Sequence, residues 1–511
     1  MVSGMNRHTL GTLVERRAWL ILIAGTALLM ALQLAEAPPL WFDEGWILSV
    51  ARNFVERGHY GQLLAGVHAS ASMLNVGFPA VLPIALSFKL LGVGAWQGRL
   101  PGVLFTIGFL LLIHLLAKRL YGRRVAVCSL AVLALFSTIP VFRVGKQALG
   151  EMPMLFYLLV GLAIFSRYPK RPLVILPAAA FFWGLGMMTK LHLVPFLTLA
   201  LLLLITRALF KRRWLDAGRY SLVLTASLGF FFLFFKIQEV LLNDRMMRLP
   251  AVYGITAWVP VWEIRLFSLG VLTVLGIPTL IALFHAAVGH FKKSTSPAEE
   301  MGIQAVRFII VTFLLGWMAW FTLLSNGWQR YLVAPVFLAS IFLAVFLHSA
   351  TNGYSLPYTV KQAALALRLG RSQRRNWAAL VALLVVIMGL AGNLRAVRDT
   401  FAGADRSAMD VAGYINAHSP PDSLVESYEW EVLFLLNRPY HYPSDEVQVE
   451  LYRRSIAGQV LDTGYDPLRA DPDLLVIGDI GRFWHLYDNA LASQRFQLIG
   501  KFGRYELYRR R

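Results

Sequence analysis

Two adjacent carboxylates, Asp43 and Glu44, come directly after the first long apolar segment of the chain. A carboxylate near the depth of a bilayer is costly unless water, a partner or a function accounts for it. Trp41 and Trp46 flank the pair, and tryptophan favours the boundary between membrane and water. The pair is therefore either a site of acid–base chemistry at a membrane surface or an exposed acidic turn that caps a helix, and its position fits both.

Further carboxylates and cations stand between apolar segments later in the chain. If the chain brings them to the same surface as Asp43, they form a charged set on one face of a helical bundle. Besides Asp43 and Glu44, the predicted members of this set are Arg143, Glu151, Lys190, His192, Arg245, Arg248 and Arg330.

Such a set suits the transfer of a group from an anionic lipid head group to a neutral hydroxyl or amine. Asp43 would act as the general base, removing the proton of the acceptor as it attacks the anomeric carbon of a sugar. Lys or Arg would bind the phosphate, which gains charge as it leaves. Asp43 and Glu151 also suit a divalent metal, because hard cations favour oxygen ligands, although two carboxylates alone do not establish one.

Composition sets the class of protein. The chain of 511 residues is 57% hydrophobic and 15% charged, with a mean hydropathy of +0.57, which indicates a polytopic membrane protein. Its formal charge of +20 suggests cytoplasmic loops and anionic lipid head groups rather than nucleic acid. The single cysteine, Cys128, excludes an intrachain disulfide and a cysteine metal cluster. We expect no nucleotide or organic cofactor.

Eleven segments are apolar over a length close to the roughly 20 residues that cross a bilayer. The first follows a basic N-terminus like that of a signal peptide, but no small-residue cleavage site precedes Asp43, so we expect an uncleaved span. A twelfth apolar segment, 73–88, is short and contains two prolines. The predicted spans are about 18–35, 100–117, 125–142, 152–166, 172–189, 191–206, 217–235, 266–289, 308–325, 331–350 and 377–394.

The distribution of positive charge decides whether 73–88 crosses. If it does not, the loops on the side of the N-terminus hold 23 Lys and Arg, and the short loops on the other side hold 8. If it does, every later loop changes sides, against the positive-inside tendency. We therefore predict a cytoplasmic N-terminus, a helix at 73–88 in the outer interface, and one long external loop, 36–99. Within this loop, 45–56 is expected to form an amphipathic helix on the membrane surface.

The polar end of the chain predicts a second domain. The predicted fold class is an α-helical polytopic membrane protein with about eleven transmembrane helices in residues 1–398, followed by a small external α/β domain, 399–511. The expected helices of this domain are 406–417, 430–436 and 483–493, and the expected strands are 423–428, 473–478, 496–500 and 504–508.

Several short motifs occur in a definite order. Asp-Glu follows the first span and Arg99-Leu100-Pro101 opens the second, while Arg143 and Glu151-x-Pro153 follow the third; Thr189-Lys190 and Arg330-Tyr331-Leu332 come later. In this order and sidedness, the chain resembles the GT-C superfamily of polyprenyl-phosphate-sugar glycosyltransferases, in the branch of protein O-mannosyltransferases and lipid A aminoarabinose transferases. The resemblance covers about residues 18–350.

The resemblance implies an inverting transferase of the plasma (inner) membrane. Its donor would be a polyprenyl-phosphate-linked monosaccharide, and its acceptor an extracytoplasmic lipid, glycan or protein. Asp43 would be the base, and Glu151 matches the second acidic position of the family. One stretch departs from the family: a His-Pro-Pro or Lys-Pro motif often precedes the re-entrant helix, where this chain has the sequence SMLNVGFP at 72–79. A phosphate contact made there in some relatives is not carried over.

Two other classes of function are open at this stage. A transporter or flippase of lipid-linked sugars would use the charged set as a head-group site, but no repeat between the two halves of the chain supports it. A receptor or scaffold would account for the C-terminal domain but not for Asp43 and Glu151. Individual cations also have a plainer interpretation, since Arg143 would serve as a head-group anchor and Arg330 as a helix cap.

Overall fold

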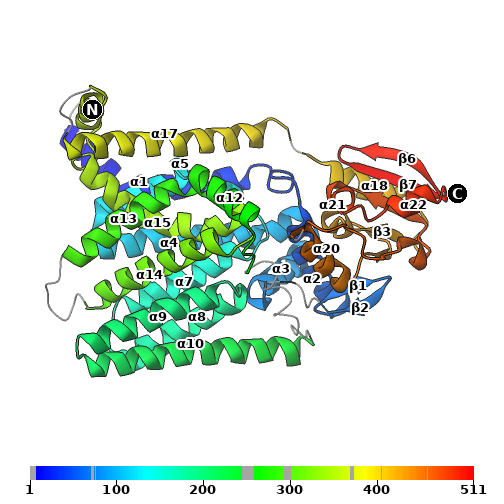
Figure 1. Cartoon of the computed structure of the whole chain (residues 1–511), viewed down its shortest axis with the longest axis horizontal. Coiled ribbons are helices and arrows are strands. Elements are labelled where there is room, and N and C mark those ends of the chain that lie inside the picture. The colour runs from blue at the N-terminus through cyan, green and yellow to red at the C-terminus, as the bar shows by residue number, and fades with distance from the viewer. Residues whose placement is uncertain are drawn as a thin grey trace, which may run out of the picture.

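The computed structural model describes residues 7–70, 74, 76–243, 258–292, 301–368, 373–403, 405–456 and 458–511. Its apolar helices form a bundle, and a small sheet lies beyond one end of that bundle (Figure 1). The helices α2 (Phe42–Arg57) and α3 (Phe78–Leu91) lie between the bundle and the sheet. The predicted fold class, a helical membrane protein with a small C-terminal α/β region, is confirmed.

The bundle is helical because a chain segment in hydrocarbon must satisfy its backbone hydrogen bonds within itself. A single π turn, Leu272–Gly276, joins two of the helices. In chain order, the helices of the bundle are α1 (Arg7–Ala31), α4 (Ala95–Tyr121), α5 (Arg123–Leu135), α7 (Glu151–Phe165), α8 (Pro172–Thr189), α9 (Leu193–Phe210), α10 (Trp214–Leu241), α12 (Trp262–Val271), α13 (Ile277–Lys292), α14 (Met301–Leu323), α15 (Val333–Ala350) and α17 (Arg374–Phe401).

Eight stretches of the described residues are long and apolar enough to cross a membrane, and each overlaps a predicted span. The other three predicted spans fall on α1, α5 and α7, whose apolar lengths are shorter, so the count of eleven stays a prediction. The 14 residues of α3 rise about 21 Å, less than the ~30 Å of a hydrocarbon core. The helix α16 (Leu356–Leu367), which Ser355 caps, was not predicted and occupies the loop predicted at 351–376.

The external loop is more regular than predicted. α2 begins at Phe42, so Asp43 and Glu44 lie in its first turn and not in a turn before it. Carboxylates are favoured in a first turn, because its N–H groups point at them and the helix dipole is positive there. The stretch after α2, for which no strands were predicted, forms a hairpin of β1 (Gln62–Leu64) and β2 (Val67–Ala69).

The C-terminal region is a five-stranded mixed sheet in the order β4-β3-β5-β7-β6. Its strands are β3 (Val425–Ser427), β4 (Tyr440–His441), β5 (Leu474–Ile477), β6 (Phe496–Phe502) and β7 (Tyr505–Arg510), and its helices are α18 (Ser407–His418), α19 (Trp430–Leu433), α20 (Asp445–Ile456), α21 (Asp479–Phe483) and α22 (Asp488–Ala492). β3 pairs in parallel with β4 and β5, and β7 pairs antiparallel with β5 and β6. The four predicted strands are present. The predicted helix 483–493 is split into parts, and α20 was missed. The strand β4 was also missed, because two strand residues carry no periodic signal.

The prediction that α2 lies on the membrane surface was wrong. Most of the helix is buried, because the C-terminal region covers its second face. The Trp46 ring stacks on that of Trp430 with centroids 5.5 Å apart, and Arg52 donates hydrogen bonds of 2.8 Å to the carbonyls of Phe434 and Leu436. A single buried hydrophobic cluster therefore joins α2, α3 and the sheet, across the predicted boundary between 1–398 and 399–511.

Candidate active site

A buried ion pair fixes the first turn of α2 against the bundle. Neither Glu44 nor Arg99 has an exposed side chain, and the Arg99 guanidinium donates a hydrogen bond of 2.7 Å to each oxygen of the Glu44 carboxylate. The Ala148 N–H donates a further one to Glu44 at 2.9 Å, and Arg99 donates to the Leu34 carbonyl at 3.0 Å. These bonds offset the cost of burying two charges. Glu44, predicted to be catalytic, thus holds α2 in place and does not face solvent.

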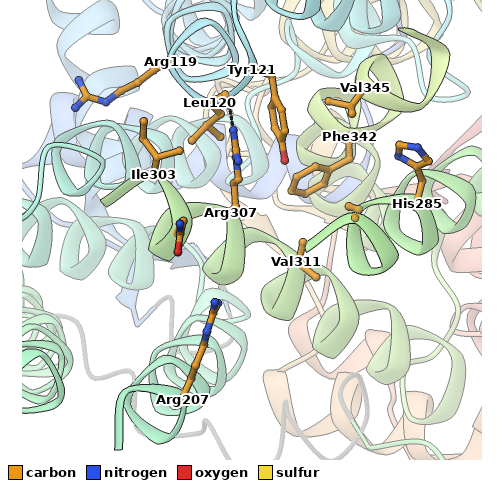
Figure 2. Close-up of a pocket in the computed structure, with 13 residues that line it drawn as sticks. Arg119, Leu120, Tyr121, Arg207, His285, Ile303, Arg307, Val311, Phe342 and Val345 are labelled. Atoms are coloured by element: carbon orange, nitrogen blue, oxygen red, sulfur yellow. Dashed lines mark hydrogen bonds between the residues drawn. The ribbon is translucent and has the colours of Figure 1, made fainter. Parts of the chain in front are cut away.

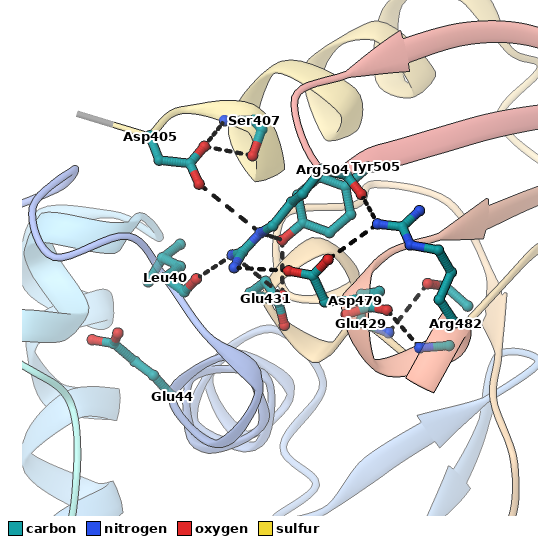
Figure 3. A network of polar contacts seen from close by, with 12 residues as sticks. Leu40, Glu44, Asp405, Ser407, Glu429, Glu431, Asp479, Arg482, Arg504 and Tyr505 are labelled. Atoms are coloured by element: carbon teal, nitrogen blue, oxygen red, sulfur yellow. Dashed lines mark hydrogen bonds and ion pairs between the residues drawn. The ribbon is translucent and has the colours of Figure 1, made fainter. Parts of the chain in front are cut away.

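The C-terminal region holds the other side of the same turn. A Cβ atom at Gly45 would lie 2.3 Å from the backbone nitrogen of Glu431, so the close approach requires glycine. Arg504 donates to the Leu40 carbonyl at 3.0 Å and lies 3.6 Å from the Glu431 carboxylate, as Figure 3 shows. Burial raises the pKa of the Glu431 carboxyl, which accepts a hydrogen bond of 2.8 Å from the Tyr505 hydroxyl.

Asp43 lies in this fixed turn and forms an ion pair with Arg330. Each of the two side chains is 24% exposed, so solvent or a substrate reaches the pair. Arg330 belongs to a short 3-10 helix, Gln329–Leu332, directly before α15. Its guanidinium lies over the rings of Trp328 and Trp41, at 4.6 Å and 5.6 Å from their centroids, where a delocalised cation is attracted by the aromatic faces. The pair is a carboxylate and a cation at an accessible position.

A second ion pair joins Glu151, the first residue of α7, to Lys190, which follows α8. Its side chains are only 5% and 8% exposed. The carbonyl of Thr189 accepts a hydrogen bond of 3.1 Å from the Gly77 N–H, which places the start of α3 beside this pair. The Oε2 atom of Glu151 has no hydrogen-bond partner among the described residues. An acceptor is therefore open for one more donor.

His192 lies between the two ion pairs. Its ring centroid is 4.9 Å from that of Tyr331, the neighbour of Arg330, and 5.6 Å from that of Trp320. Burial, together with the charge of Lys190, lowers the pKa of His192 to about 3, so the imidazole is neutral at neutral pH. The predicted role of His192 in binding the substrate stays a prediction.

A family model matches part of the sequence, and solved structures match the fold. Residues 79–235 match the family model described as dolichyl-phosphate-mannose-protein mannosyltransferase. The structure matches ArnT from Cupriavidus metallidurans bound to undecaprenyl phosphate with a TM-score of 0.65 and 15% sequence identity, over 96% of this chain and 98% of that one. The chain has the GT-C glycosyltransferase fold. The resemblance predicted from the sequence is thereby confirmed.

A second GT-C structure matches over nearly the whole chain. It is the archaeal oligosaccharyltransferase AglB from Archaeoglobus fulgidus in complex with an inhibitory peptide and a dolichol-phosphate, with a TM-score of 0.54 and 11% identity over 98% of this chain and 75% of that one. No curated protein matches the chain in sequence. At these identities the likeness establishes the GT-C fold, and the roles of single residues rest on the contacts described above.

Three predicted site residues remain: Arg143, Arg245 and Arg248. Arg143 is exposed, at the end of the short helix α6 (Val141–Val144). Arg245 and Arg248 lie outside the described residues, as do 72, 73 and 75 of the stretch that departs from the family. The roles of these residues stay predictions.

The metal ion predicted between Asp43 and Glu151 can be compared with the contacts of these two carboxylates. Each carboxylate is paired with its own cation, Arg330 or Lys190, and the described parts of the chain contain no group of three His, Cys, Asp or Glu that could hold a metal ion. The A. fulgidus oligosaccharyltransferase in complex with Zn and sulfate matches the structure with a TM-score of 0.52 and 11% identity, over 93% of this chain and 71% of that one. For this chain a divalent cation stays a prediction.

Three residues that position the site were missed as such from the sequence. Arg99 was noticed only as part of a motif at the start of a span, Gly45 was not singled out, and Arg504 lies far along the chain. The adjacency of Glu44 to Asp43 signals that one of the two carboxylates has a structural role. The contact partner of each residue depends on the fold and cannot be predicted from the residues next to it in the sequence.

Proposed function

We propose that the chain is an inverting glycosyltransferase that moves a monosaccharide from a polyprenyl-phosphate donor to an extracytoplasmic acceptor. The observation that carries the proposal is the accessible ion pair of Asp43 and Arg330, in a turn that Glu44 and Gly45 hold in place. Asp43, which would accept a proton, and Arg330, which would bind a phosphate, are thus neighbours. ArnT and AglB, which share the fold, are described with undecaprenyl phosphate and dolichol-phosphate.

In the proposed reaction, the donor phosphate binds the Arg330 guanidinium, and the ion pair between Arg330 and Asp43 breaks. The freed carboxylate of Asp43 removes the proton from the acceptor hydroxyl or amine as that atom attacks the anomeric carbon. A bond forms between the acceptor atom and the anomeric carbon, and the bond from that carbon to the phosphate oxygen breaks on the opposite face, which inverts the configuration. The polyprenyl phosphate leaves with one more negative charge, which Arg330 stabilises. No step requires a metal ion.

The other residues have supporting roles in this proposal. Glu44 and Arg99 position the turn that carries Asp43. Lys190 supplies a second positive charge near the donor phosphate, and the free oxygen of Glu151 accepts a hydrogen bond from a hydroxyl of substrate. Membrane lipids surround the bundle, and the site lies on the extracytoplasmic side.

The test is consumption of the donor. Membranes that contain the chain and a radiolabelled polyprenyl-phosphate sugar are expected to release polyprenyl phosphate and to label an acceptor. Membranes that contain the Asp43→Asn variant should do neither. Movement of intact donor across the membrane without consumption would show a transporter and overturn the proposal.

Replacing Arg330 by alanine should impair the use of the donor. The change removes charged hydrogen bonds worth about 1.5–3 kcal/mol, so kcat/KM for the donor should fall roughly 10- to 100-fold. Arg330→Lys should restore only part of it, because an ammonium cannot reproduce the planar fork. Kinetics at varied donor concentration measure the effect, and thermal unfolding should change little because the side chain is partly exposed. Lys236→Ala, which removes an exposed cation paired with Glu239, is the matched control. Unchanged donor kinetics in Arg330→Ala would exclude this role.

The proposed sidedness has its own test, made in a Cys128→Ser background. Gln497 is exposed on β6 and Arg375 is exposed at the start of α17. Gln497→Cys should react with an impermeant thiol reagent in intact cells, whereas Arg375→Cys should react only after lysis. The reverse pattern would place the sheet and the site in the cytoplasm.

A further inference from the structure

A cavity of about 760 Å³ lies at the end of the bundle opposite to Asp43. Its walls come from the last turn of α4 and from α9, α13, α14 and α15. On α4, Arg119 lines the cavity while Arg99 holds the active-site turn, and the twenty residues between them on one helix correspond to about 30 Å. The cavity is therefore separate from the site of Asp43 and Arg330.

Three arginines from three helices line this cavity: Arg119, Arg207 and Arg307. In Figure 2, Arg307 lies between Arg119 above and Arg207 below. Arg307 donates to the Leu120 carbonyl and lies over the Tyr121 ring, 4.2 Å from its centroid. No carboxylate is among the described residues that line the cavity. Among the described residues, the lining therefore contains three positively charged side chains and no carboxylate.

The opposite wall is apolar. Val311, Phe342 and Val345 contribute to it, from α14 and α15 (Figure 2). An apolar wall next to a basic rim suits an amphiphile, with an anionic group at the rim and a chain along the wall. Two buried nitrogens of lining residues, Nε of Arg307 and Nδ1 of His285, have no hydrogen-bond partner among the described residues. The Arg307 nitrogen can donate a hydrogen bond to a ligand, and the His285 nitrogen can donate or accept one.

We propose that this cavity binds the phosphate head group of an anionic membrane lipid, such as phosphatidylglycerol. Phosphate oxygens accept charge-assisted hydrogen bonds from guanidinium groups, and the planar fork of arginine can form two parallel bonds to one phosphate. A basic pocket between membrane helices near the head-group level is a recurring form of lipid site. The volume lies within the roughly 300–1,000 Å³ of small-molecule sites. The ligand at this end is a bound lipid and not the donor at the Asp43 site.

The experiment measures lipid binding by the full chain in detergent micelles. Thermal unfolding is recorded while phosphatidylglycerol or phosphatidylcholine is added, and native mass spectrometry counts retained lipids. Phosphatidylglycerol should raise the melting temperature and remain bound, whereas phosphatidylcholine should do neither at the same concentration. The readout does not involve sugar transfer, so it stands or falls independently of the proposed function.

Variants separate this cavity from general attraction to anionic lipid. Arg207→Gln and Arg307→Gln should each weaken phosphatidylglycerol binding about tenfold or more, since each removes a charged hydrogen bond. Arg212→Gln removes an exposed cation from the same end of α9 but outside the lining, and should leave binding within about twofold of the original. If Arg307→Gln fails to fold because its bond to Leu120 is lost, Arg207→Gln decides alone.

Three results would overturn the proposal. Equal weakening by Arg212→Gln would show only diffuse attraction, and unchanged binding in Arg207→Gln would exclude the cavity. Sodium phosphate that gives the same stabilisation as the lipid, and displaces nothing by mass spectrometry, would identify a soluble phosphate as the ligand.

Discussion

Asp43→Asn should lower the rate of sugar transfer by roughly 10²–10⁴, the usual contribution of a general base. The amide keeps the shape of the side chain and an oxygen that accepts a hydrogen bond from Arg330, so the turn should stay folded. It cannot take the proton of the acceptor. Single-turnover transfer from a radiolabelled polyprenyl-phosphate sugar measures the loss, and thermal unfolding verifies that the variant is folded.

The matched control is Glu36→Gln. Glu36 belongs to the same external loop, is 30% exposed, and pairs with Arg406 at 3.4 Å, so it is also a partly exposed carboxylate paired with an arginine. An exposed pair contributes only about 0–1 kcal/mol, and transfer should remain close to that of the original chain. A folded Asp43→Asn variant that transfers at the rate of Glu36→Gln would remove Asp43 as the base.

Glu44→Gln should have the largest effect on stability. It leaves the buried Arg99 guanidinium without a counter-charge, and removing one partner of such a pair costs about 3–5 kcal/mol. Both side chains have no exposed surface, so solvent does not screen the loss. We expect a lower yield and a marked fall in melting temperature, while the protein that does fold keeps most of its turnover.

A second change distinguishes loss of the pair from loss of a catalytic group. In Glu44→Gln/Arg99→Leu the unpaired charge is gone, and replacing a buried pair by neutral groups is often close to neutral, so stability should recover in part. Glu56→Gln, which removes the 39% exposed partner of Arg52 on the same helix, should change the melting temperature little. Full stability of Glu44→Gln with lost turnover would return Glu44 to the catalytic set.

Local patterns in the sequence predicted the parts that depend on local physics. Apolar segments become helices because a chain in hydrocarbon must satisfy its own backbone, and their positions agree with eight candidate spans. Alternation and turn residues predicted four strands of the C-terminal sheet, whereas the two residues of β4 were too few. The start of α2 was placed three residues too late, at 45 instead of Phe42, because an acidic pair suits a turn as well as a first helical turn.

For the site, the sequence indicated individual residues but not their contacts. The sequence indicated Asp43, Glu151, Lys190 and Arg330, since charged residues next to apolar segments are costly without a purpose. It did not indicate that Asp43 pairs with Arg330 and Glu151 with Lys190, nor that Glu44 is buried. Pairing depends on which helix ends meet, and that is decided by packing across hundreds of residues.

By itself, the sequence determined a helical membrane protein of GT-C type, and it predicted that the acidic residues Asp43 and Glu44 belong to its site. Only the tertiary structure decided that α2 is enclosed by the C-terminal region, that Arg504 contacts the segment leading to Asp43, and that His192 packs against Trp320 and Tyr331. Hydrophobic periodicity tells which face of a helix is buried but not what covers it. Whether a carboxylate is buried and paired, as Glu44 is, or accessible, as Asp43 is, depends on residues far away in the sequence.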